Sequence, residues 1–343
     1  MWHLKHPSID DLNKYNNLLL PSLMASIDGS NNQPIKNTLL PTMQDGSKDD
    51  SILKRLLNAT PKELYMLTNQ LMNILVAGYN DAEFESYLEA KNTRTINRNP
   101  QQVSLYNKYD SILTDLSDIF DYKQKISSNK SRAYTISGIK GRNSCTYCNR
   151  QYTQTIVRNG GANNDNRIAR PQFDHWFSKE LFPLMSLSFF NLIPSCSICN
   201  SSAKGNAIFR FNTHVHPYIQ TKTNPDFNFS YKAKTNGKWE VDIENATDLR
   251  ENNMIDDFHL REVYKYHSDL ELKDILDFSY ANNETYLNTL LNQIMMKFPQ
   301  KSKEDIYRMF FGTELKEDKF LDRPISKLKF DILKKLGITD IFD

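Results

Sequence analysis

Two short stretches, Cys145-Thr146-Tyr147-Cys148 and Cys196-Ser197-Ile198-Cys199, decide the fold of this chain. They hold all four cysteines of the 343 residues, and 47 residues separate them. Each Cys-x-x-Cys pair can turn two thiolates toward one metal ion, and two such pairs complete a tetrahedral zinc site. Disulfides or redox dithiols are the alternatives, but a thioredoxin-type site needs one such pair rather than two.

We therefore predict a structural zinc site formed by Cys145, Cys148, Cys196 and Cys199. Four sulfurs fill the coordination of such an ion and leave no open position for a substrate or a water. Any chemistry is then expected elsewhere in the chain.

The composition excludes general disorder, because 39% of the residues are hydrophobic and 11% are aromatic. No apolar run approaches the length of a membrane-spanning helix, and the first residues contain no apolar signal segment. We expect a cytoplasmic protein with no membrane partner, which also argues against disulfides. The net charge is +2, but residues 141–216 hold eight Lys and Arg against three Asp and Glu, which suits a polyanionic partner.

The chain divides into three regions, and the predicted class is α+β, mainly helical. Residues 1–140 read as an N-terminal helical region, with capping signals at Thr60 and Asn80 and a polar stretch over 26–50 that predicts a loop. Residues 141–216 form the compact mixed unit around the cysteines, with strands expected over 147–157 and 168–176.

Residues 217–343 begin with a predicted β-hairpin, and helices follow it to the end. The hairpin joins 227–233 to 239–243 through an Asn236-Gly237 turn. Ser302 is a predicted helix cap, and 325–336 predicts a basic amphipathic helix whose lysines form a solvated face.

Between and beside the cysteine pairs lie polar residues at fixed intervals. Asp174-His175 comes first, Asn191 follows, and Asn200 stands directly after Cys199. Over about residues 145–205 the chain resembles the zinc-stapled branch of the HNH endonuclease family. The resemblance consists of Cys-x-x-Cys, then Asp-His, then Asn-Leu-x-x-x-Cys-x-x-Cys-Asn, in that order. The stretch 173–205 is also similar to HNH effectors of bacterial anti-phage systems such as the Septu type, in which the nuclease works beside an ATPase.

The resemblance implies a central ββα-metal unit between the two helical regions. It implies that His175 is the general base and that Asp174 and Asn200 hold a catalytic divalent ion. Asn191 would fix the loop that bears His175. Because the last position is Asn rather than His, the ligands favour Mg²⁺ or Mn²⁺. A histidine can accept a proton from water near neutral pH, and a small hairpin-helix unit needs a zinc site for rigidity.

Other basic residues near the motif are weaker candidates. Lys179, Lys204 and Arg210 are candidate phosphate contacts, although a solvated side chain is the more common role of such a residue. His214 and His216 alternate along one stretch and are candidates for an auxiliary role at the phosphate or metal.

The sequence thus predicts a metal-dependent endonuclease that hydrolyses DNA, most simply double-stranded, and serves as an anti-phage effector with an ATPase partner. Oligomerisation would allow one active site per chain to make double-strand breaks. Two alternatives stay open. One is a non-catalytic zinc module that binds nucleic acid or protein, and the other is an HNH enzyme that cleaves RNA.

Overall fold

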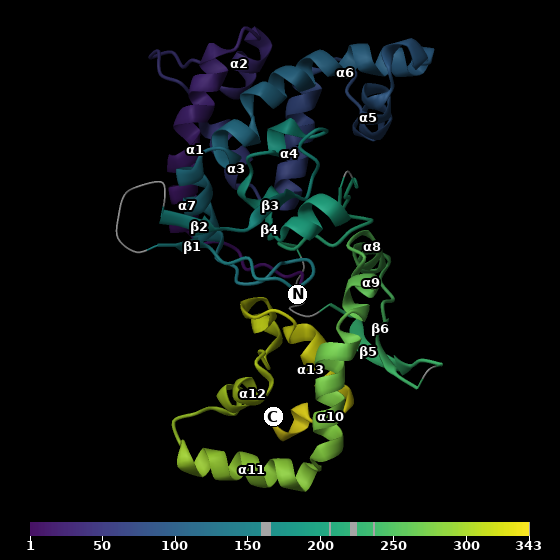
Figure 1. The fold of residues 1–343 in the computed structure, drawn as a ribbon. Helices are drawn as coiled ribbons and strands as arrows, with labels where there is room; N and C mark the ends of the chain where they lie inside the picture. Colours follow the sequence, from purple (N-terminus) through teal and green to yellow (C-terminus); the bar gives the residue numbers. More distant parts are fainter. Residues whose placement is uncertain (159–165, 206, 220–224, 236, 343) are drawn as a thin grey trace.

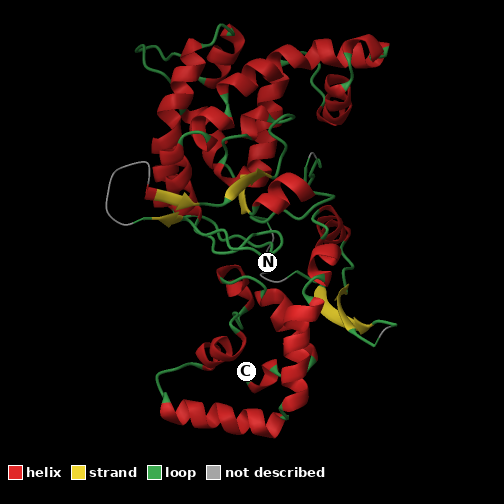
Figure 2. Ribbon diagram, viewed as in Figure 1, coloured by secondary structure: helices red, strands yellow, loops and turns green. Residues whose placement is uncertain are grey.

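Helices make up most of the structure, and small antiparallel sheets lie between them (Figures 1 and 2). The computed structural model describes residues 1–343 except 159–165, 206, 220–224, 236 and 343. Helices α2 and α6 lie at the top of Figure 1, β3 and β4 lie below them, and α11 lies at the bottom. No helix in the described part of the chain is both long and apolar enough to cross a membrane.

Local capping side chains begin several of the N-terminal helices, and the cap at Thr60 is one that the sequence predicts. Ser8, Thr60 and Asn99 each form a capping box with the residue three positions on. The helices are α1 (Ile9–Gly29), α2 (Gln33–Leu39), α3 (Ser51–Asn58), α4 (Pro61–Leu75), α5 (Phe84–Asn92), α6 (Pro100–Ile119) and α7 (Lys130–Lys140).

The predicted loop over 26–50 is wrong in part. Helix α1 continues to Gly29, and α2 occupies the middle of the stretch. The Asn32 side chain accepts a hydrogen bond from the amide of Ile35 at 3.2 Å and caps α2. Ile35 and Leu39 are fully buried, so two apolar residues on one face stabilise a helix that the polar composition conceals.

The central region holds two short hairpins. Strand β1 (Ile156–Val157) pairs with β2 (Arg167–Ala169), and β3 (Gln172–His175) pairs with β4 (Leu192–Ser195). The predicted strand over 147–157 is therefore wrong except for its last two residues. Residues 143–153 instead close a tight loop, because Cys145 donates to the carbonyl of Gln151 at 2.9 Å and Thr153 donates to that of Asn143 at 2.9 Å.

The C-terminal region confirms the predicted hairpin, formed by β5 (Asn228–Ala233) and β6 (Trp239–Glu244). Asn236 of its turn lies outside the described residues, and Gly237 has φ +76°, which glycine adopts without strain. The helices that follow are α8 (Leu249–Asp257), α9 (Leu260–Lys265), α10 (Lys273–Ala281), α11 (Glu284–Lys297), α12 (Lys303–Phe311) and α13 (Ser326–Lys335). Ser302 caps α12 as predicted.

The solvated lysine face predicted for α13 is wrong at Lys327. This side chain is fully buried and forms a 3.0 Å ion pair with Asp331, one helical turn later. Its ammonium also lies 4.7 Å from the centre of the Phe227 ring. The helix packs on β5, so the face that carries Lys327 belongs to the core and not to the surface.

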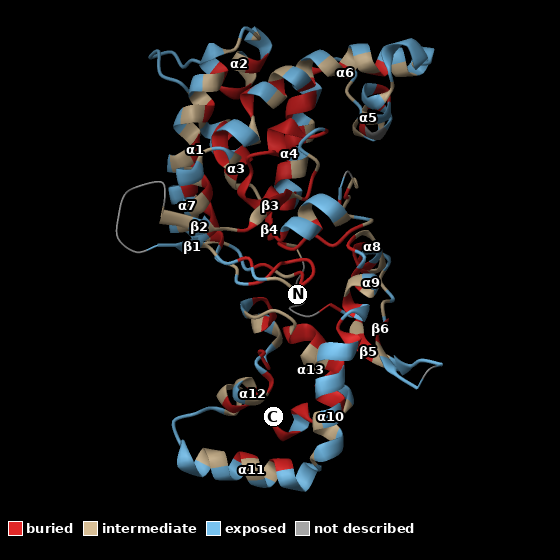
Figure 3. Cartoon of the chain, in the orientation of Figure 1, coloured by how far each residue is buried: buried red, intermediate tan, exposed pale blue. Residues whose placement is uncertain are grey.

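Contacts far apart in sequence join the three regions into one hydrophobic core (Figure 3). The N-terminal segment adds backbone hydrogen bonds from Trp2 to Thr146 and from Leu4 to Pro217, at 3.2 and 2.9 Å. The Tyr15 hydroxyl of α1 donates to the carbonyl of Leu187 at 2.7 Å. On the other side, the amide of Ser144 donates to the carbonyl of Leu321 at 3.1 Å, so both flanking regions hold the central region.

Candidate metal centre and adjoining cavity

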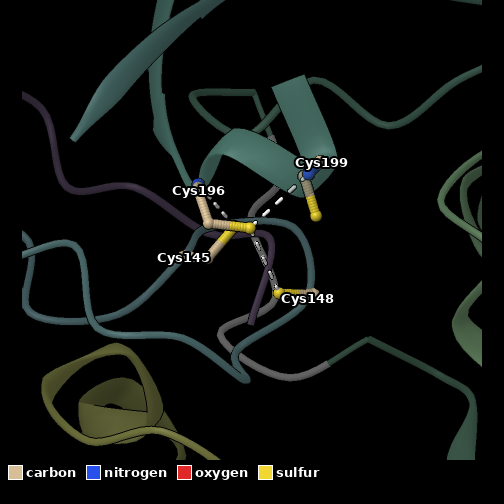
Figure 4. Close-up of side chains that lie close together, drawn as sticks. All are labelled: Cys145, Cys148, Cys196 and Cys199. Carbon is tan, nitrogen blue, oxygen red and sulfur yellow. Dashed lines mark hydrogen bonds between the residues drawn. The ribbon is translucent and has the colours of Figure 1, made fainter. Parts of the chain in front are cut away.

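The four cysteines meet in one buried cluster, as their spacing predicts. Their sulfurs all lie within 4.8 Å of one another, and the Cys148 and Cys196 sulfurs are 3.9 Å apart (Figure 4). Tetrahedral zinc with bonds of about 2.3 Å would set sulfurs about 3.8 Å apart. The cluster can therefore hold a metal ion such as zinc.

Backbone amides orient the sulfurs of this cluster. The amide of Cys196 donates to the sulfur of Cys145 at 3.3 Å, and that of Cys199 donates to the sulfur of Cys196 at 3.5 Å. The amide of Arg150 donates to the sulfur of Cys148 at 3.4 Å. Such N–H···S contacts favour thiolates, because they place partial positive charge against the sulfur.

The β3–β4 hairpin positions the Asp-His pair next to the cysteine cluster. Asp174 lies opposite Ile193 and His175 lies opposite Leu192, just before the second cysteine pair begins. The π-helical turn η7 (Ile198–Ala203) follows the hairpin and carries Cys199 and Asn200. The hairpin and the helical turn thus both adjoin the cysteine cluster.

His175 is held in one tautomer by its backbone partner. Its Nε2 lies 2.9 Å from the carbonyl oxygen of Ser186, and because a carbonyl only accepts, Nε2 carries the hydrogen and donates. The Tyr122 ring meets the imidazole edge-on, with centroids 4.5 Å apart. Burial, reinforced by the positive charge of Lys179, lowers the pKa of His175 to about 3. The ring is therefore neutral near pH 7, and its Nδ1 holds a free lone pair.

Asn191 closes the loop that follows His175. This side chain is fully buried, and its Oδ1 accepts from the amide of Phe177 at 2.7 Å. Its amide nitrogen donates to the carbonyls of Phe177 and Met185, at 3.1 and 3.0 Å. Asn191 thus bonds to the chain just after His175, and also to Met185, which directly precedes Ser186, the partner of His175.

Asp174 is engaged on both carboxylate oxygens. The Lys204 ammonium lies 3.0 Å from Oδ1 and 2.9 Å from Oδ2, and the Tyr147 hydroxyl donates to Oδ2 at 2.6 Å. Burial raises the pKa of Tyr147 well above 10, so this hydroxyl stays protonated. Nothing in the sequence motif marks Tyr147, which stands between the first two cysteines, as a partner of Asp174.

Asn200 lies beside the same cavity, and its amide nitrogen donates to the Gln172 side chain at 2.8 Å. The cavity, about 230 Å³ in volume, is lined by Tyr122, Asp174, His175, Lys179, Asn200 and Lys204 among others. Lys179 is exposed at this cavity, as a phosphate contact must be.

The structure does not bring every candidate to this cavity. The guanidinium of Arg210 lies 5.1 Å from the centre of the Phe182 ring. His214 pairs with Asp257 at 2.9 Å, and His216 is buried, with its ring 4.5 Å from that of Trp176. His214 and His216 line a separate pocket of about 180 Å³, so the auxiliary role predicted for them has no support in this arrangement.

The oxygen donors of Asp174 and Asn200 are of the type that Mg²⁺ and Mn²⁺ prefer. In this arrangement, however, the Lys204 ammonium already lies against both oxygens of Asp174, and the donors do not fit a divalent ion beside it. Comparisons with protein-family models, with curated proteins and with solved structures each gave no match.

Proposed function

We propose that the chain is an HNH-type endonuclease that hydrolyses phosphodiester bonds in DNA. The observation that carries the proposal is the state of His175. Its Nε2–H is fixed on Ser186, which leaves Nδ1 as the proton acceptor of a ring that lines a polar cavity.

A neutral imidazole in this tautomer can take a proton from an attacking water at Nδ1. The hydrogen bond to Ser186 orients the ring, and it strengthens when the imidazole becomes charged. Lys179 stands exposed beside the same cavity and can contact a phosphate oxygen of the bound strand. If Lys204 were displaced, Asp174 and Asn200 would be the residues to hold Mg²⁺ or Mn²⁺, and such an ion would supply positive charge beside the phosphate.

The cysteine cluster serves this proposal as a rigid support. A bound zinc would tie β4 and η7 to the loop that carries Tyr147, and Tyr147 contacts Asp174. A base must lie within hydrogen-bond reach of the water that it activates, so such rigidity has a direct use in catalysis.

A plasmid cleavage assay tests the proposal, with wild type compared against His175→Ala in Mg²⁺, Mn²⁺ or EDTA. His259→Asn is the matched control, because His259 is exposed and has the positive φ of 49° that asparagine tolerates. We expect cleavage by wild type and by the control, and loss of at least 100-fold in His175→Ala with its zinc retained. Cleavage at the wild-type rate by a zinc-loaded His175→Ala would refute the general-base role.

The same assay separates the alternatives. A protein that binds plasmid and zinc but cuts neither plasmid nor single strands is a binding module, and preferential cutting of RNA identifies an RNA-cleaving enzyme. The anti-phage role and the ATPase partner rest on the family resemblance alone. Protection of cells against phage by wild type and not by His175→Ala would support that role.

A further inference from the structure

The ammonium of Lys204 is surrounded by oxygen atoms. It contacts both oxygens of Asp174, the carbonyl of His175 and, at 3.5 Å, the carbonyl of Trp176. The side chains of Lys204 and Asp174 are only 4% and 6% exposed. An ammonium in a shell of oxygens, with its counter-ion buried beside it, is an internal cation rather than a surface charge.

These oxygens are also the ones that a divalent ion would need. Mg²⁺ and Mn²⁺ bind carboxylate and carbonyl oxygens, and both carboxylate oxygens of Asp174 lie within hydrogen-bond distance of Lys204. Two cations held against one carboxylate would repel each other strongly in so buried a place. Occupancy of Asp174 by Lys204 and by a divalent ion is therefore mutually exclusive.

The backbone places Lys204 at this position through the second cysteine pair. Its amide donates to the carbonyl of Cys199 at 3.2 Å, five residues earlier, which is the spacing of a π-helical turn. Gly205 follows with φ +50° and lets the chain leave the turn at once. The Phe209 ring lies 4.5 Å from the ammonium on its other side.

We propose that Lys204 is the resident cation of the Asp174 site and that a divalent ion binds Asp174 only by displacing it. Lys204 then acts as a positioning residue that keeps Asp174 ordered before metal enters, and it sets the metal concentration at which the site fills. This inference rests on the proposed nuclease function for the identity of the ion, and on the contacts between Lys204 and Asp174 for the competition.

Mn²⁺ binding to the zinc-loaded full chain tests the competition directly, by electron paramagnetic resonance of free Mn²⁺. We expect Lys204→Met to bind Mn²⁺ at least 10-fold more tightly than wild type, and Lys204→Arg, which keeps the charge, to match wild type. Lys179→Met is the matched control, since it removes a lysine that borders the same cavity without touching Asp174, and it should change the affinity less than 3-fold. Asp174→Asn should abolish binding at this site.

Equal Mn²⁺ affinity in wild type and Lys204→Met overturns the inference, as does binding that survives Asp174→Asn. Zinc content and thermal melting identify any variant that fails to fold. A second measurement uses only wild type and the conservative variant Lys204→Arg. In protein labelled with ¹⁵N-lysine, the buried ammonium should give a slowly exchanging signal that Lys204→Arg removes.

Saturating Mg²⁺ should abolish this signal in wild type, and a signal that persists overturns the inference. If the proposed nuclease function is wrong but the competition is right, the plasmid stays intact while the Mn²⁺ affinity still depends on Lys204. Cleavage that needs Mg²⁺, combined with Mn²⁺ affinity indifferent to Lys204, refutes the competition alone.

Discussion

Replacement of Asn191 by alanine gives the sharpest test of how the His175 loop is held. The change removes three hydrogen bonds, one accepted from Phe177 and two donated to the carbonyls of Phe177 and Met185. Each neutral bond contributes about 1 kcal/mol net, and the partners are left buried without water. We therefore expect Asn191→Ala to lower the free energy of unfolding by about 3 kcal/mol.

The functional effect should exceed what instability alone explains. Met185 precedes Ser186, whose carbonyl fixes the His175 ring, so a relaxed loop lets the imidazole leave its orientation. Misplacement of a catalytic group by about 1 Å costs about 100-fold in rate. We expect plasmid cleavage to fall by about that factor at a temperature where Asn191→Ala is still folded and holds zinc.

Urea denaturation measures the stability, and cleavage at saturating DNA measures the rate. Ser188→Ala is the matched control, because the Ser188 hydroxyl is buried in the same loop and has no hydrogen-bond partner in the structure. This control should keep wild-type stability within about 0.5 kcal/mol. A loss below about 1 kcal/mol in Asn191→Ala, or equal losses in both variants, would refute the loop-fixing role.

Three further predictions concern metal, a buried ion pair and pH. Cys199→Ser, or a strong chelator, should release the metal and destabilise the fold by several kcal/mol. Zinc release and thermal melting measure these two effects, and an unchanged melting temperature would contradict a structural metal. Lys327→Met should lower the free energy of unfolding by about 3–5 kcal/mol, because the buried carboxylate of Asp331 then lacks the ammonium of Lys327. In urea unfolding, the double variant with Asp331→Leu should recover part of that loss in free energy. Burial lowers the pKa of His175 to about 3 and that of His216 well below its usual 6.5, so below about pH 6.5 the unfolded chain binds protons that the folded chain does not. The free energy of unfolding should therefore decrease as the pH is lowered below about 6.5, by up to about 1.4 kcal/mol per pH unit for each histidine. Urea midpoints that stay constant from pH 7 to 5 in excess zinc would contradict this prediction.

Local patterns predicted their own structure well. The two Cys-x-x-Cys pairs meet as expected, since each knuckle needs only its own few residues to orient two sulfurs. The caps at Thr60 and Ser302 and the β5–β6 hairpin follow from short-range hydrogen bonds and turn preferences in the same way.

Contacts that depend on long-range packing could not be predicted from the sequence. The pairing of Asp174 with Lys204 joins residues 30 positions apart, and no periodicity indicates it. Lys204 was expected as a phosphate contact, and its burial against Asp174 could not be foreseen from its neighbours in the chain. The prediction that Lys327 is solvated failed for a related reason. Tertiary packing decides which side of α13 meets β5, and the helical pattern alone does not show it.

Asn149, directly after the first cysteine pair, has a consequence for when this protein can finish folding. Its side chain donates to the carbonyls of Phe320 and Arg323, at 2.7 and 3.1 Å, and its own carbonyl accepts from the amide of Ile325 at 2.5 Å. Folding during synthesis proceeds from the N-terminus. A nascent chain on the ribosome therefore holds the cysteine loop incomplete until residues 320–325 have emerged. The proposed active site would then be assembled only after residues 320–325 have left the ribosome, which delays any cutting activity until that stage of synthesis.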